Sequence, residues 1–210
     1  MAMVSSAEHL DGILAGGPAA RIVRLRDGRV VALRVASSED AAAVQQFVRG
    51  LSERSRRNRF FAPLRDLSPD QLQRVTRSHP PDDLALVGEI MTEDGEARIV
   101  AMAQYAACEP LDAEFAVVVD DAWQRQGLAT QLVCVLGEQA ARAGLTTLSG
   151  FVLPDNWPML EFLARLDCEL VTDTDPNLIR AVMRTRRRSD GAPSHAAAGS
   201  SRFCMDGVGI

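Results

Sequence analysis

Residues 113–133 read AEFAVVVDDAWQRQGLATQLV, and this stretch decides the fold. Its valine-rich run, Phe115–Val119, predicts a buried strand. A short loop follows, and Gly127 then opens the clearest helix of the chain, which we expect to run to Ala143 before Gly144 caps it. The stretch is therefore a strand, a tight loop and a helix in direct succession.

The remaining elements alternate around this unit. Alternating apolar residues between turn signals predict strands at Arg29–Val35, Leu84–Ile90, Ile99–Ala106, Leu148–Leu153 and Leu178–Met183. Capping residues and helical spacing predict helices after Ser37–Asp40, from Pro69 and over Pro158–Leu166. Because helices and strands interleave, we expect an α/β (α+β) class: a mixed, splayed central sheet flanked by helices on both faces.

The chain of 210 residues suits one domain of ordinary size. Residues 1–20 are rich in alanine, glycine and serine, and we interpret them as a flexible lead-in. Residues 21–186 form the predicted domain. Residues 187–210 are polar and without periodicity, which indicates a disordered tail.

Composition excludes several classes of function. The net charge of −5 argues against a nucleic-acid binder, and all 23 basic residues are arginine, which rules out a catalytic or phosphate-loop lysine. The cysteines and histidines are too scattered for a metal site. We expect no signal peptide, because the N-terminal residues lack a basic segment and a long apolar run, and no membrane helix, because no apolar run approaches about 20 residues. We expect a cytoplasmic protein with reduced thiols and no membrane partner.

The start of the Gly127 helix is the first candidate binding site. A helix start presents unpaired backbone N–H groups and a partial charge of about +0.5, which attract an anion. In the pattern Gln124-x-x-Gly127-x-Ala129 the small residues would let a diphosphate approach the backbone. A Rossmann GxGxxG turn and a Walker lysine are both absent. The alternative interpretation is that the small residues only pack the helix against the sheet.

This pattern at a strand-to-helix junction resembles the acetyl-CoA pyrophosphate motif of the GNAT superfamily of N-acetyltransferases. Residues 152–156, VLPDN, followed by Met159, Phe162 and Leu166, are similar to the second motif of that family. The resemblance covers Ile22–Thr185 and implies acetyl-CoA as co-substrate, bound in the cleft between the fourth and fifth predicted strands, with no metal. It implies these cofactor-binding residues: Val117, Val118, Val119, Gln124, Arg125, Gln126, Gly127, Leu128, Ala129, Thr130 and Asn156.

Within the superfamily, the chain resembles the acetyltransferase domain of bacterial protein lysine acetyltransferases that act on acyl-CoA synthetases. Three segments carry this resemblance: LRDGRVVALRVASSEDA, LSERSRRNRFFAPLRDLSPDQL and AEFAV. In the third, the family places a glutamate as general base, which implies that role for Glu114. The alternative is that Glu114 is only a strand residue that faces solvent.

Two positions depart from the family pattern. Many relatives carry a tyrosine that protonates the leaving thiolate, and here that position is Leu163. The glycine–aromatic pair that usually follows is Asp167-Cys168. The first departure is consistent with the protein-acetylating branch, whereas the second predicts a different turn after the last helix.

Other residues have a structural alternative beside the functional one. Asn156 is either a helix cap alone or a cap that also contacts the ligand. The arginine cluster Arg54, Arg56, Arg57 and Arg59 is interpreted as a solvated loop or helix face, with a lip of the acceptor site as the alternative. Phe60 and Phe61 are predicted to be core anchors.

The expected reaction is transfer of an acetyl group from acetyl-CoA to an amine, most simply a protein lysine, by direct attack on the thioester. Two alternatives stay open: a small-molecule amine acetyltransferase, and a non-catalytic acyl-CoA-binding regulatory module.

Overall fold

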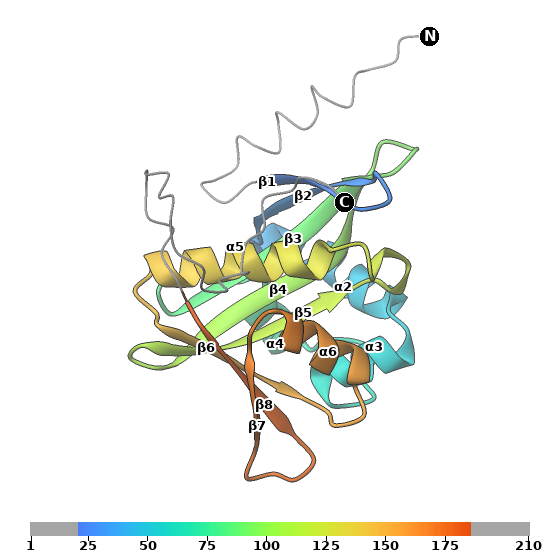
Figure 1. The fold of residues 1–210 in the computed structure, drawn as a ribbon. Coiled ribbons are helices and arrows are strands. Elements are labelled where there is room, and N and C mark those ends of the chain that lie inside the picture. Colours follow the sequence, from blue (N-terminus) through green and yellow to red (C-terminus); the bar gives the residue numbers. More distant parts are fainter. Residues whose placement is uncertain (1–20, 186–210) are drawn as a thin grey trace, which may run out of the picture.

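A computed structural model describes residues 21–185, in one mixed sheet with helices on both faces (Figure 1). The predicted lead-in (1–20) and tail (187–210) lie outside the described residues. The strands are β1 (Arg21–Arg24), β2 (Val30–Val35), β3 (Asp83–Met91), β4 (Ala97–Glu109), β5 (Asp112–Val119), β6 (Thr147–Val152), β7 (Glu169–Thr172) and β8 (Ile179–Arg184). The helices are η1 (Ser38–Asp40), α2 (Ala41–Gly50), α3 (Glu53–Phe60), α4 (Pro69–Thr76), η2 (Asp121–Trp123), α5 (Leu128–Arg142) and α6 (Trp157–Arg165).

The sheet has the order β1-β2-β3-β4-β5-β6-β8-β7. Every pair of neighbours is antiparallel except β5 and β6, which are parallel. A parallel pair needs a crossover connection, and α5 supplies it. The predicted class, a mixed sheet flanked by helices, is confirmed.

Two apolar cores lie on opposite faces of the sheet. Side chains along a strand alternate between faces, so Phe115, Val117 and Val119 of β5 join the core under α5 and α6. Val118, between them, joins the core formed with α2 and α4. In Figure 1, α5 and α6 (yellow and orange) lie on the near face of the sheet and α2 lies behind it. The two faces of β5 therefore pack against different helices, α5 and α6 on one face and α2 and α4 on the other.

Helix α5 has the predicted buried stripe. Leu128, Leu132, Leu136 and Ala140 are each at most 1% exposed. Gly127 before the helix and Gly144 after it have φ angles of +90° and +91°, in the left-handed region that favours glycine. The helix boundaries are therefore set by two glycines that the sequence analysis had identified.

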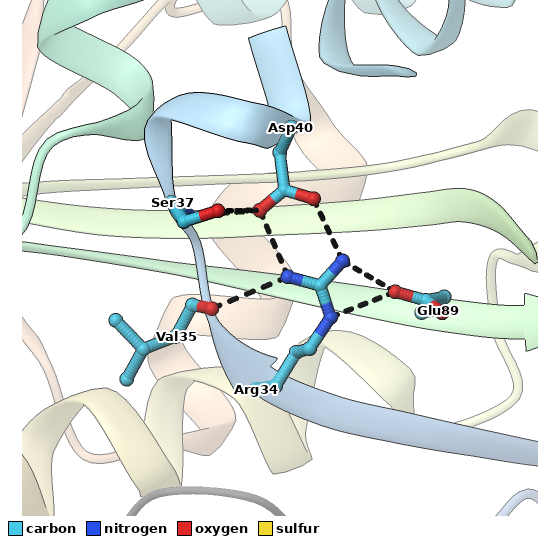
Figure 2. Close-up of polar contacts among 5 residues, drawn as sticks. All are labelled: Arg34, Val35, Ser37, Asp40 and Glu89. Carbon is cyan, nitrogen blue, oxygen red and sulfur yellow. Dashed lines mark hydrogen bonds and ion pairs between the residues drawn. The ribbon is translucent and has the colours of Figure 1, made fainter. Parts of the chain in front are cut away.

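A charged network holds the start of α2 against the sheet (Figure 2). The Arg34 guanidinium donates to both carboxylate oxygens of Asp40, at 2.7 and 2.8 Å, and through Nε to Glu89 at 2.7 Å. The N–H of Ser37 donates to Asp40 at 2.8 Å, which confirms the predicted cap. Burial raises the pKa of Asp40, but the bonds from Arg34 and Ser37 outweigh it, so the pKa lies below its ordinary value.

Two features differ from the sequence analysis, and a third agrees with it. Strand β1 was not predicted, because four residues are too few for a periodic signal. The arginine segment interpreted as a solvated loop or helix face is helix α3, which buries no residue fully. Phe60 packs against the core as predicted, but the prediction for Phe61 is wrong. Phe61 has a φ of +55° at the C-terminal cap of α3, and its side chain is 45% exposed.

Candidate active site

A cleft of about 1340 Å³ opens where β5 and β6 separate. The two strands pair only from Asp112 to Glu114 on β5 and from Thr147 to Ser149 on β6. At Gly150 they still touch, since a Cβ there would lie 2.8 Å from the carbonyl oxygen of Phe115. Beyond that point Phe115–Val119 has β4 on one side and no strand on the other. The free edge of β5 therefore forms one wall of the cleft.

The loop between β5 and α5 forms the floor at one end of the cleft. Arg125 and Gly127 both have left-handed backbone conformations, with φ angles of +62° and +90°. The first N–H groups of a helix have no acceptor within the helix. The backbone N–H groups of Gly127–Thr130 can therefore bind an anion, and the positive end of the α5 dipole adds to the attraction. This end of the cleft suits a phosphate group.

Basic side chains reinforce the positive character of this end. Arg24, Arg26 and Arg125 line the cleft. The N–H of Arg26 donates to the carbonyl of Gln126 at 3.3 Å, which fixes the β1–β2 turn against the loop. No sequence signal identified Arg24 or Arg26 as site residues, because they reach the cleft from the unpredicted strand β1 and its turn.

Helix α3 is tied to the same loop by polar contacts. Asp121 accepts hydrogen bonds from the N–H of Ser52 at 3.0 Å and from the hydroxyls of Ser52 and Ser55, both at 2.8 Å. Burial raises the pKa of Asp121, but these bonds outweigh it and the pKa lies below its ordinary value. The Gln124 side chain donates to the carbonyl of Val119 at 3.0 Å and to Ser55 at 3.3 Å. The loop and α3 are therefore joined into one wall of the cleft.

The structure brings most of the predicted residues together in this cleft. It is lined by Glu114, Val117, Val118, Val119, Gln124, Arg125, Gly127, Ala129, Thr130 and Asn156. Gln126 and Leu128 do not line it. Leu128 begins the buried stripe of α5, so its side chain faces the core and only its backbone remains at the helix start. Ligand contact by all twelve residues stays a prediction.

Glu114 lies on β5 at the last residue that pairs with β6. Its side chain is exposed and lines the cleft. Its neighbours on either side are Ala106 of β4 and Ser149 of β6. By alternation it points to the same face as Val118, which is the face that carries α2 and α4. A carboxylate therefore stands at the apex of the cleft, on the side opposite α5.

Asn156 sits at the N-cap position of α6, but its side chain makes no cap hydrogen bond. It is only 7% exposed, and it lines the cleft. Both alternatives place Asn156 at the helix cap, and that position is confirmed, whereas a cap bond from its side chain is not formed. Ligand contact by the carboxamide, which can both donate and accept hydrogen bonds, stays a prediction.

The two departures from the family pattern have distinct structural outcomes. Leu163 is 2% exposed and belongs to the core, and the one tyrosine of the chain, Tyr105, is 1% exposed on β4 outside the cleft. Burial raises the pKa of Tyr105 to about 12, with Asp83 and Asp82 adding to the shift. Asp167 has a φ of +55°, the left-handed conformation ordinarily taken by glycine. The turn is therefore formed without glycine.

Comparison with known proteins decides the family. The model of the acetyltransferase (GNAT) family matches residues 49–167, more than half of the chain. The chain belongs to the GNAT family. The matched region includes α3, the free edge of β5, the α5 start and α6, so it contains nearly all of the cleft described above. Members of this family use acyl-CoA as co-substrate, so membership supports acyl transfer as the class of reaction.

Individual relatives agree with this assignment. The chain is 36% identical over 121 residues to acetyltransferase PA5475 of Pseudomonas aeruginosa, covering 57% of this chain and 64% of that protein. It is similar to the GNAT domain of S. lividans PAT, with a TM-score of 0.72, 26% identity, and coverage of 79% of this chain and 97% of that domain. A cAMP-binding acyltransferase from Mycobacterium smegmatis shares the fold, with a TM-score of 0.56 and 21% identity; the match covers 92% of this chain and 56% of that protein.

The described part of the chain also lacks two features. Within residues 21–185 no cluster of three or more histidine, cysteine, aspartate or glutamate side chains could hold a metal ion. No helix in the same range is both long and apolar enough to span a bilayer.

Proposed function

We propose that this GNAT protein transfers an acetyl group from acetyl-CoA to the ε-amine of a protein lysine. The observation that carries the proposal is the geometry of the cleft. A helix start whose N–H groups suit a phosphate lies at one end, a free strand edge runs along the wall, and the carboxylate of Glu114 stands at the apex. The likeness to the PAT domain, at 26% identity, supports the same branch of the family.

The binding residues would act through position and charge. The N–H groups of Gly127–Thr130, with Arg24, Arg26 and Arg125, would hold the diphosphate. The free edge of β5 would pair with the peptide-like arm of CoA, as an exposed strand edge pairs with a peptide. Bound in this way, acetyl-CoA supplies an activated thioester carbonyl, which backbone N–H groups of β5 would polarise.

Glu114 is the proposed general base. A lysine amine has an ordinary pKa of about 10.4, so at neutral pH it must lose a proton before it attacks. The Glu114 carboxylate takes that proton directly or through water. The nitrogen lone pair then forms a bond to the carbonyl carbon, the carbon–sulfur bond breaks, the thiolate leaves, and the nitrogen releases its second proton to water. Because Leu163 replaces the usual tyrosine, the thiolate takes its proton from water or leaves ionised.

Product analysis tests this function. Acetyl-CoA is incubated with the full chain and, separately, a lysine peptide with a blocked N-terminus, a polyamine and free lysine. Release of CoA gives the rate, and mass spectrometry locates the acetyl group. We expect acetylation of the peptide ε-amine with a higher kcat/KM than for either small amine. A preference for a small amine, or tight binding of acetyl-CoA with no turnover on any acceptor, would overturn the proposal.

A further inference from the structure

Helix α3 presents arginines to the cleft that lack an acceptor in the described part of the chain. Arg56 donates to the carbonyls of Arg49 and Leu51, and Arg57 pairs with Asp155 at 2.9 Å. Arg54 and Arg59 line the cleft and form no hydrogen bond or ion pair with any of residues 21–185. Each guanidinium carries five N–H donors and strongly prefers a carboxylate or phosphate partner.

Two arginines, one on α3 and one on β8, lie on either side of Glu114. Arg59 is half-buried, and loss of water lowers its pKa to about 10, partly opposed by the charge of Glu114. On the other side of the apex, Arg180 of β8 donates to the Ser149 hydroxyl at 3.4 Å, and Ser149 pairs in register with Glu114. The proposed base is therefore flanked by positive charge from both α3 and β8.

The acids on this face are mostly engaged already. Asp83 shares a row of the sheet with Glu114 through Ala106, but it is bound to Arg77 at 2.7 Å. Asp121 and Asp155 hold the serines and Arg57 of α3. Glu161 of α6 lines the cleft as well. None of these four acids forms an ion pair with Arg54 or Arg59.

Two exposed aromatic residues line the same cleft. Phe61 ends α3 and is 45% exposed, and Trp157 begins α6 and is 68% exposed. Between these helices runs the Arg57–Asp155 ion pair, which holds the end of α3 beside the start of α6. Exposed tryptophan and arginine together are the residue types that dominate binding energy at protein interfaces.

We propose that Arg54, Arg59, Arg180, Phe61 and Trp157 form an acceptor rim that docks a protein whose target lysine is flanked by carboxylates. The inference rests on the proposed function and names its substrate class. Carboxylates beside the lysine would satisfy the guanidinium donors while the lysine enters toward Glu114. A free polyamine carries only positive charge, so the same rim would repel it.

A peptide library tests the rim. Peptides with blocked N-termini, one central lysine and varied residues on both sides are incubated briefly with the full chain and acetyl-CoA, and acetylated peptides are counted by mass spectrometry. One exposed ion pair strengthens binding by up to about fivefold. With two such pairs we expect aspartate and glutamate to be enriched about 10-fold over arginine beside the acetylated lysine.

A matched pair of variants locates the effect. Arg54→Glu should reduce the enrichment to about threefold or less, because it replaces an attractive charge with a repulsive one. Arg74→Glu makes the same change on the exposed face of α4, outside the cleft, and should keep the wild-type enrichment. Should Arg54→Glu fail to fold, the wild-type protein at about 1 M salt, where the Debye length is about 3 Å, provides the second test by losing the enrichment.

The outcomes separate the two proposals. Lysine acetylation with no preference for acidic neighbours, or with the same preference at high salt, overturns the rim and leaves the proposed function standing. An unchanged preference in folded Arg54→Glu also overturns the rim. Absence of acetylated lysine from the whole library overturns the proposed function and the rim with it.

Discussion

Replacement of Gly127 by glutamate tests the phosphate end of the cleft. The φ of +90° makes any side chain there strained by about 1–2 kcal/mol, and no atom lies within 4 Å of the added Cβ, so the carboxylate would extend into open space. At about 6 Å and an effective dielectric constant of about 20, it would repel one unit of phosphate charge by about 3 kcal/mol. We therefore expect acetyl-CoA to bind about 100-fold more weakly.

Calorimetric titration of acetyl-CoA measures this loss, and Gly144→Glu is the matched control. Gly144 has a φ of +91°, has equally open space around its Cβ, and lies beyond the opposite end of α5. Both variants should lose stability, since both place a side chain in a strained left-handed conformation, but only Gly127→Glu should lose affinity for acetyl-CoA. Equal affinities of the two folded variants for acetyl-CoA would refute the placement of the diphosphate at the start of α5.

Three further predictions concern stability and self-modification. Asp40→Asn should lower the free energy of unfolding at pH 7 by about 1–3 kcal/mol in urea titrations. Because the pKa of Asp40 is depressed in the folded state, the wild-type advantage should start to shrink near about pH 4 and be lost as the pH falls through that lower pKa; an advantage that does not shrink on acidification would contradict the network. Gly150→Ala should lower the free energy of unfolding by about 1–3 kcal/mol, because the added methyl group would press against Phe115. Gly50→Ala, where the added methyl group meets open space, should not lower it. Equal unfolding midpoints for the two variants would show that β5 and β6 are not in contact at Gly150. Since the chain contains no lysine, intact-mass analysis after incubation with acetyl-CoA should find at most one stable amide-linked acetyl group, and several would contradict the acceptor chemistry.

The sequence predicted those parts of the site whose signals are local. Gly127 and Gly144 mark turns that only a left-handed conformation completes, and the leucine stripe between them fixes α5. The valines of β5 were recognised as core, and their free edge follows from the parallel pairing with β6. Periodicity and turn chemistry operate within a few residues, which is why these elements were predictable.

The rest of the site depends on contacts between distant segments. Ser52 and Asp121 are 69 residues apart in the chain, and no pattern within either segment indicates the bond. Helix α3 has no buried face and hence no apolar period. The error at Phe61 has the same origin, because the left-handed cap that turns it outward is set by the tertiary course of the chain.

The role of Glu114 is the central claim, and a pH series of initial rates with a lysine peptide tests it most directly. Glu114→Gln keeps the shape and removes the proton acceptor, so kcat should fall about 10²–10⁴-fold while acetyl-CoA affinity stays nearly unchanged. Glu109→Gln, on an exposed residue at the end of β4 outside the cleft, should keep the wild-type rate. The wild-type kcat/KM should rise with pH as base and amine lose protons, and Glu114→Gln should retain only the dependence due to the amine. A Glu114→Gln protein with nearly full rate across the series would contradict this account.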